Sequence, residues 1–158
     1  MSFRIRGLSP AQFEPLFALD DLALAERSMR RVLIDEPDSA PCRITLQDAA
    51  PGEHVLLLPF AHHMVHSPYR ASGPIYIREG ALQGAREAFD RIDELPPVFA
   101  PRILAVRAYD GEGMMIHADV VEADPRNLFK DYFADPATDY IHVHYARRGC
   151  YSCLVERA

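Results

Sequence analysis

Residues 140–153 read YIHVHYARRGCYSC, and two runs of alternating side chains flank a short polar turn in this stretch. Alternation of this kind is typical of half-buried strands, so the segment predicts a β-hairpin around ARRG. If the turn holds four residues, Tyr145 lies opposite Cys150 and His144 lies opposite Tyr151. This register places two sets on opposite faces: His142, His144, Tyr151 and Cys153 on one, and Ile141, Val143, Tyr145 and Leu154 on the other. The apolar set is expected to face the core.

A second hairpin is predicted at residues 102–122. Two alternating segments, 102–109 and 114–122, flank DGEG, and Asp-Gly supplies the positive φ of a tight turn. The same criteria predict further strands at 3–8, 42–46, 54–60 and 75–79, and helices at 10–17, 20–30, 81–92 and 125–133. The sequence therefore predicts an α+β fold with a mainly antiparallel sheet of about eight strands, an N-terminal helical pair and one or two crossover helices.

Length and composition predict one compact domain over residues 1–158, since 49% of the residues are hydrophobic and 25% are charged. A net charge of −6 argues against nucleic acid as a partner. The longest apolar run, 55–61, is too short to cross a bilayer, which argues against a membrane role. An odd cysteine count and a polar, arginine-containing start favour a cytoplasmic protein.

Two histidines in the last hairpin form the first candidate site. His142 and His144 are two residues apart, about 7 Å along a strand, so both could bind one zinc or iron ion or act in acid–base catalysis. A cross-strand cysteine could add a ligand. His117 and Asp119 repeat the spacing and would join them if the two hairpins were neighbours. The alternative is that these are solvated or hydrogen-bonded structural histidines.

A second candidate site is the segment 62–74, which reads HHMVHSPYRASGP and has no regular period. Its hydroxyls and guanidinium could bind an anion, and the candidate ligand-binding residues are His66, Ser67, Tyr69, Arg70 and Ser72. In the alternative interpretation Arg70 pairs with a carboxylate and the serines bond turn carbonyls.

The cysteines leave two interpretations open. Cys42 precedes Arg43, and Cys150 lies close to Arg147 and Arg148, so either thiol could be an activated nucleophile. A cysteine on an apolar strand is otherwise an inert small hydrophobe.

Three strings in this order, HSPYRASGPIYIREG (66–80), RAYDGEGMM (107–115) and YIHVHYARRGCY (140–151), resemble the family known as domain of unknown function 1203. The resemblance implies a single-domain, mostly bacterial protein, and it carries no established activity. The residues that match the family's strings are His66, Ser67, Pro68, Tyr69, Arg70, Ala71, Ser72, Gly73 and Pro74, then Ile141, His142, Val143, His144, Gly149 and Cys150.

Two functional hypotheses follow. The first is a small cytoplasmic enzyme with a His/Arg/Tyr pocket where segment 62–74 crosses the last hairpin. It would act on a small anionic metabolite held by Arg70 with Ser67 or Ser72, and His142 or His144 would be the base or hold a metal. The alternative is a non-catalytic module that binds a small ligand or forms a homodimer through sheet edges, with structural histidines. A catalytic or metal site should show clustered, perturbed histidines in a concave pocket, whereas the structural alternative predicts that each imidazole is bonded to a backbone carbonyl and that there is no pocket.

Overall fold

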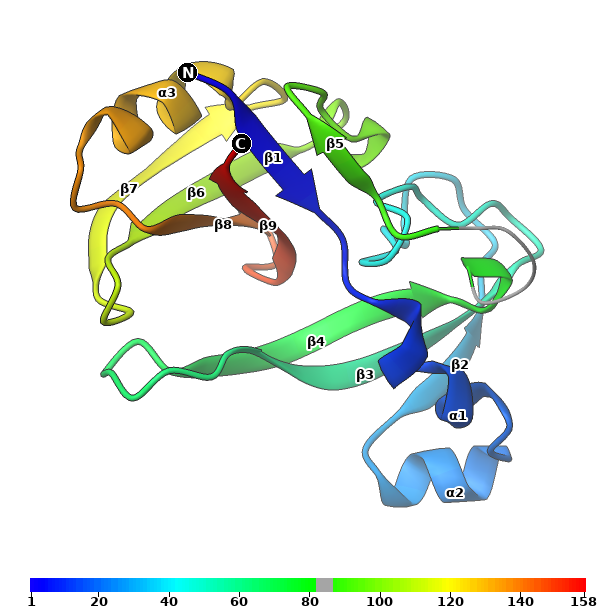
Figure 1. Cartoon of the computed structure of the whole chain (residues 1–158). Coiled ribbons are helices and arrows are strands. Elements are labelled where there is room, and N and C mark those ends of the chain that lie inside the picture. The colour runs from blue at the N-terminus through cyan, green and yellow to red at the C-terminus, as the bar shows by residue number, and fades with distance from the viewer. Residues whose placement is uncertain (82–86) are drawn as a thin grey trace.

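The structure is a computed structural model that describes residues 1–81 and 87–158, and within them the strands form two antiparallel sheets (Figure 1). The six-stranded sheet has the order β5 (Asp90–Ile92), β1 (Phe3–Arg6), β9 (Tyr151–Arg157), β8 (Tyr140–Tyr145), β6 (Ile103–Tyr109), β7 (Met115–Glu122). The three-stranded sheet has the order β2 (Arg30–Leu33), β3 (His54–His63), β4 (Ala71–Arg78). The predicted α+β class is confirmed, with the strands divided between two sheets.

The helices of the described residues are short. They are α1 (Glu14–Phe17), α2 (Asp21–Glu26) and α3 (Arg126–Ala134), with 3₁₀ turns at Pro10–Gln12, Glu79–Ala81 and Pro97–Phe99. Asp20 caps α2 by accepting a hydrogen bond from the Ala23 N–H at 2.8 Å. No helix in 1–81 or 87–158 is long and apolar enough to cross a membrane.

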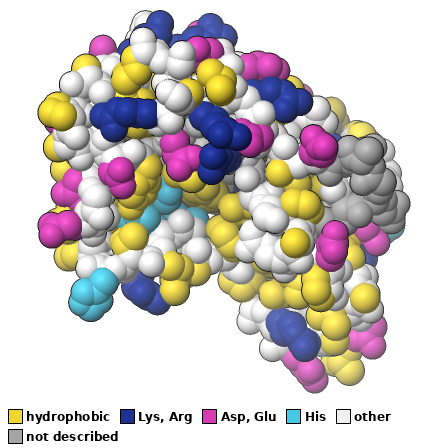
Figure 2. Space-filling model, in the orientation of Figure 1, with side chains coloured by type: hydrophobic (Ala, Val, Ile, Leu, Met, Phe, Trp, Pro, Cys, Tyr) yellow, Lys and Arg dark blue, Asp and Glu magenta, His cyan; other side chains and the backbone are white. Residues whose placement is uncertain are grey.

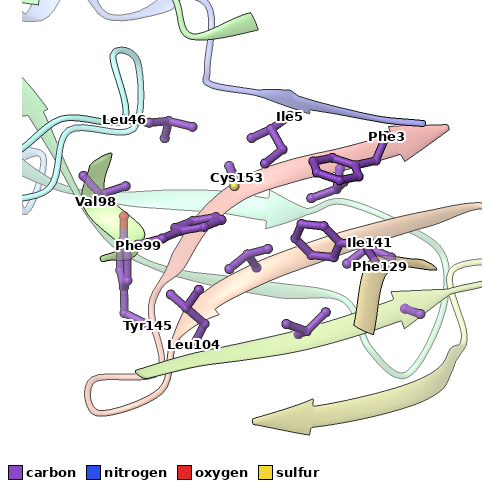
Figure 3. Close-up of a cluster of buried hydrophobic side chains, with 14 of the residues drawn as sticks. Phe3, Ile5, Leu46, Val98, Phe99, Leu104, Phe129, Ile141, Tyr145 and Cys153 are labelled. Carbon is purple, nitrogen blue, oxygen red and sulfur yellow. The ribbon is translucent and has the colours of Figure 1, made fainter. Parts of the chain in front are cut away.

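One face of the six-stranded sheet forms the larger hydrophobic core (Figure 3). Alternate residues of β6 and β8 point into it, including Leu104, Val106, Ile141 and Val143, and α3 adds Phe129. Side chains alternate across a strand, so the other residues of β6 and β8 lie on the opposite face. That opposite face carries the two histidines of β8.

The last hairpin contains a β-bulge, and its register therefore differs from the predicted one. His144 pairs with Tyr151 as expected, but the register then shifts, so that Val143 pairs with Cys153 and His142 with Leu154. One extra residue in a strand moves every following side chain to the other face. The expected placement was therefore wrong for Cys153, which lies in the core, and for Leu154, which lies beside His142.

β3 extends to His63, beyond residue 60 where the predicted strand ends, and Pro59 does not interrupt it. β2 pairs with β3 only from His54 to Leu57, so one edge of β3 is already free at Pro59 and no ladder bond is lost there. Pro59 pairs across the sheet with Pro74, on edge strand β4. Segment 62–74 is consequently the tip of a long hairpin: its ends belong to β3 and β4.

Three further element predictions were wrong. Residues 42–46 form a turn, closed by the Leu46 N–H bonded to the Cys42 carbonyl at 3.0 Å, with Leu46 at a φ of 49°. The helix predicted to reach residue 30 ends at Glu26, because Ser28 adopts a φ of 58°, and strand β2 follows. Residues 90–92 form strand β5 instead of the end of a helix, and residues 82–86 of that prediction lie outside the described residues.

Candidate functional site

Four histidines meet where the β3–β4 hairpin lies against the six-stranded sheet. His62 and His63 end β3, and His142 and His144 lie on β8. The ring centroids of His62 and His144, and those of His63 and His142, are 5.1 Å apart. The centroids of His62 and His142 are 6.2 Å apart. We call these four residues the histidine cluster.

Tyrosine rings surround the histidine cluster. Tyr151 of β9 stacks on His62 with centroids 5.3 Å apart, and Tyr109 of β6 packs on His63 at 4.2 Å. Tyr140 stacks in turn on Tyr109 at 5.3 Å. These rings exclude water from the imidazoles on several sides.

The cluster opens on one side into a groove of about 580 Å³. Figure 2 shows histidine side chains inside the hollow between the two sheets. The groove is lined by His62, His63, Met64, Val65, Asp139, Tyr140, His142, Leu154, Glu156 and Arg157. Its volume lies within the range of small-molecule binding sites.

Hydrogen bonds fix the tautomers of two imidazoles. The Tyr69 carbonyl can only accept, so Nδ1 of His63 donates to it at 2.8 Å and Nε2 accepts from the Tyr140 hydroxyl at 2.6 Å. Nδ1 of His144 likewise donates to the Gly149 carbonyl at 3.0 Å. Nε2 of neutral His144 therefore carries the lone pair.

Three ring nitrogens of the cluster are buried without a hydrogen-bond partner: Nδ1 of His62, Nδ1 of His142 and Nε2 of His144. A buried polar group left unpaired costs about 1–3 kcal/mol. A fold that needed these side chains only as core filler would be more stable with apolar residues. The unpaired nitrogens are therefore the feature of the cluster that points to a function.

Burial keeps these imidazoles neutral. It lowers the pKa of His142 to about 2, assisted by the neighbouring histidines and Arg107. It also lowers the pKa of His144 to about 3, although the Gly149 carbonyl opposes the shift. The pKa of His62 is lowered for the same main reason. A general base works best with a pKa near the ambient pH, so these values favour neutral hydrogen-bonding or ligating roles over proton abstraction.

Tyr140 is a hydroxyl donor rather than a phenolate. Burial, with smaller contributions from Tyr109 and Asp139, raises its pKa to about 12. The hydroxyl of Tyr140 thus stays protonated and continues to donate to His63.

The five ligand-binding candidates of the hairpin tip lie outside the groove lining. His66, Tyr69, Arg70 and Ser72 are exposed. The Ser67 hydroxyl donates to the Gly113 carbonyl at 2.9 Å and accepts from the Tyr69 N–H at 3.1 Å, so it fastens the tip to the β6–β7 turn. In the described part of the chain the Arg70 side chain has no hydrogen bond or ion pair.

The pair His117 and Asp119 does not join His142 and His144. β6 lies between β7 and β8, and His117 stacks on Tyr132 of α3 while its Nε2 contacts Asp135 at 2.8 Å. Among residues 1–81 and 87–158, no three His, Cys, Asp or Glu side chains are placed to hold one metal ion. Zinc or iron at His142 and His144 therefore remains a hypothesis without a preformed set of three ligands.

Sequence reasoning placed Tyr151 on the face of His142 and His144, but it did not identify several other members of the site, namely His62, His63, Arg107, Tyr109 and Tyr140. Tyr140 shares the alternation of His142 and His144 and could have been assigned to their face. His62 and His63 were noted only as part of an irregular segment. Their contact with β8 depends on how the two sheets pack, which no local pattern encodes.

Comparison with known proteins places the chain in a family without adding an activity. No curated protein and no solved structure gives a significant match. A family model matches residues 39–157, which include the whole histidine cluster. The chain therefore belongs to the family described as "Protein of unknown function (DUF1203)".

Proposed function

We propose that the protein binds a small uncharged organic molecule in the groove, with the histidines of its lining and Tyr140 supplying the polar contacts. The observation that carries this proposal is a groove whose lining includes His62 and His142, two imidazoles whose pKa is lowered by burial. A ligand with a planar apolar part and one or two polar groups would match rings and nitrogens of this kind. The proposal follows the non-catalytic binding hypothesis more closely than the enzyme hypothesis.

The charges around the groove disfavour ionised ligands of either sign. An anion would meet the exposed Asp139, while the Arg157 guanidinium already donates to the Phe133 and Asp135 carbonyls, each at 3.0 Å. Glu156 pairs with Arg6 at 3.2 Å. A cation would meet the charge of Arg107, which contributes to the lowered pKa of His142. Burying an ion without a partner is costly, so an uncharged ligand is favoured.

Three probes of one shape and different charge test the proposal: benzamide, benzoate and benzylammonium, titrated at pH 7.5 and followed by NMR of the histidine rings. We expect benzamide to bind most tightly and to shift the His142 resonances. Tyr140→Phe removes a hydroxyl that lines the groove and should weaken binding about fivefold, the value of one hydrogen bond near 1 kcal/mol. Tyr132→Phe, which removes a hydroxyl on the opposite face beside His117, is the matched control and should change nothing.

Tighter binding of benzoate than of benzamide would overturn the proposal, as would equal losses in the two tyrosine variants. Zinc added to chelator-treated protein gives a separate arm. Stoichiometric zinc binding that shifts the His142 and His144 rings would replace the organic ligand with a metal.

A further inference from the structure

A second cavity, of about 290 Å³, lies beside the turn between β8 and β9. Four of its lining residues are arginines, Arg43, Arg102, Arg147 and Arg148, and Cys150 also lines it. We call this cavity the arginine pocket. It shares no lining residue with the groove of the histidine cluster.

The arginine pocket has more positive than negative charge. Arg102 is neutralised by Asp48, whose two carboxylate oxygens lie 2.7 and 2.8 Å from its guanidinium. Asp38 is the carboxylate among the lining residues and offsets one more charge. Four positive charges less these two leave two unbalanced, in a protein whose net charge is −6. Arg147 and Arg148 are exposed, and neither makes an ion pair within the residues that the structure describes.

Arg43 is built into the wall of the pocket. Its side chain is 1% exposed, and its guanidinium donates to the Tyr151 carbonyl at 2.7 Å, to the Pro41 carbonyl and to Cys150 Sγ at 3.1 Å. These three bonds leave two of the five N–H groups of the guanidinium free. No carboxylate is paired with Arg43 among the described residues. A buried charge without a counter-charge is costly unless a ligand provides one.

We propose that the arginine pocket binds a small oxyanion, a phosphate or carboxylate group, through Arg43, Arg147 and Arg148. The planar guanidinium matches both groups in bidentate geometry. Arg43 is fixed by its carbonyl partners, whereas Arg147 and Arg148 lie on an exposed turn and close on the anion from outside. This site is independent of the groove, with which it shares no lining residue.

Cys150 offers a built-in reporter of the pocket. Cys42 and Cys153 are each 0% exposed, so Cys150 is the thiol of the described residues that reagents reach first. Its alkylation by iodoacetate, which is anionic, and by iodoacetamide, which is neutral, can be followed by intact mass at constant ionic strength. Cys150→Ser confirms the site of modification.

The expected result is a selective effect on the anionic reagent. The double variant Arg147→Gln/Arg148→Gln should slow the alkylation of Cys150 by iodoacetate about tenfold, which is the low end of electrostatic steering. The rate of alkylation by iodoacetamide should change by no more than about twofold. Arg30→Gln/Arg70→Gln removes the same charge from exposed positions outside the pocket and is the matched control. Pyrophosphate and succinate should each protect Cys150 in the unchanged protein, and the lower protecting concentration identifies phosphate or carboxylate as the preferred group.

Three results would overturn the arginine pocket as an anion site. The first is equal slowing of both reagents in the Arg147/Arg148 variant. The second is a failure of both anions to protect Cys150 beyond the effect of sodium chloride at the same ionic strength. A slowing of iodoacetate in the Arg30/Arg70 control would likewise assign the effect to net charge instead of the pocket.

Discussion

Replacement by leucine should raise the unfolding free energy at His142 and lower it at His63, although these two histidines of the cluster are neighbours. Nδ1 of His142 is buried without a partner, and the side chain is 5% exposed. His142→Leu removes the unpaired nitrogen at nearly constant volume. Removing the unpaired nitrogen should relieve a cost of about 1–3 kcal/mol, and imperfect packing of the leucine should cost up to about 1.5 kcal/mol. The unfolding free energy should therefore rise by about 1 kcal/mol. The melting temperature should rise by about 2–4 °C.

His63→Leu is the matched control, since the rings of the two histidines are 5.1 Å apart. Both nitrogens of His63 are bonded, one to the Tyr69 carbonyl and one to the Tyr140 hydroxyl. The leucine would leave both partners unpaired and should cost about 2–4 kcal/mol. The two variants should therefore differ by about 3–5 kcal/mol in unfolding free energy.

Urea denaturation at pH 7.5, followed by circular dichroism, measures both values with the unfolded histidines mostly neutral. If His142→Leu loses as much stability as His63→Leu, Nδ1 of His142 is satisfied in solution, for example by an internal water. The unpaired nitrogens would then no longer support a ligand site.

Two further predictions concern the whole fold. Below pH 6.5 the unfolded chain protonates His142 and His144, whereas the folded protein, with pKa values of about 2 and 3, does not. Unfolding free energy should therefore fall with decreasing pH by up to about 1.4 kcal/mol per pH unit for each histidine, and His142→Leu should reduce this slope in acid denaturation. Gly7→Ala would place a Cβ 2.1 Å from the Ile44 carbonyl oxygen and should cost about 3 kcal/mol or more, whereas Gly73→Ala meets open space and should change thermal stability by about 0.5 kcal/mol or less.

The parts of the fold that the sequence predicted are those determined by neighbouring residues. The DGEG turn specifies the β6–β7 hairpin, and α3 begins at Arg126 directly after Asp124 and Pro125, with the Arg126 N–H bonded to the Asp124 carboxylate at 3.1 Å. Residues 42–46 show why alternation alone is insufficient. Arg43 is buried there because the Tyr151 carbonyl, distant in sequence, and the nearby Pro41 carbonyl accept its hydrogen bonds, and a turn rather than a strand presents the guanidinium to them.

The sequence predicted the two histidines of the candidate site that lie on β8, but not the partners that β3 contributes. The HxH pattern located His142 and His144, but their partners His62 and His63 come from a strand about 80 residues earlier, brought there by the packing of one sheet on another. The bulge that moves Cys153 into the core leaves no mark in the local pattern. From the sequence, the crossing of segment 62–74 over the last hairpin is only a hypothesis, and the contacts between individual residues depend on how the two sheets pack.

The position of β1 in the six-stranded sheet has a consequence for biosynthesis. β1 lies between β5 and β9, and Phe3 is aligned with Arg157, so nearly the whole chain separates two paired residues. Contacts between residues so far apart in the sequence form slowly. Until they form, β1 and β8 each have an unpaired edge, and unpaired strand edges promote aggregation. The sheet cannot be completed on the ribosome before β9 has emerged. We therefore expect a nascent chain that lacks β9 to depend on chaperones.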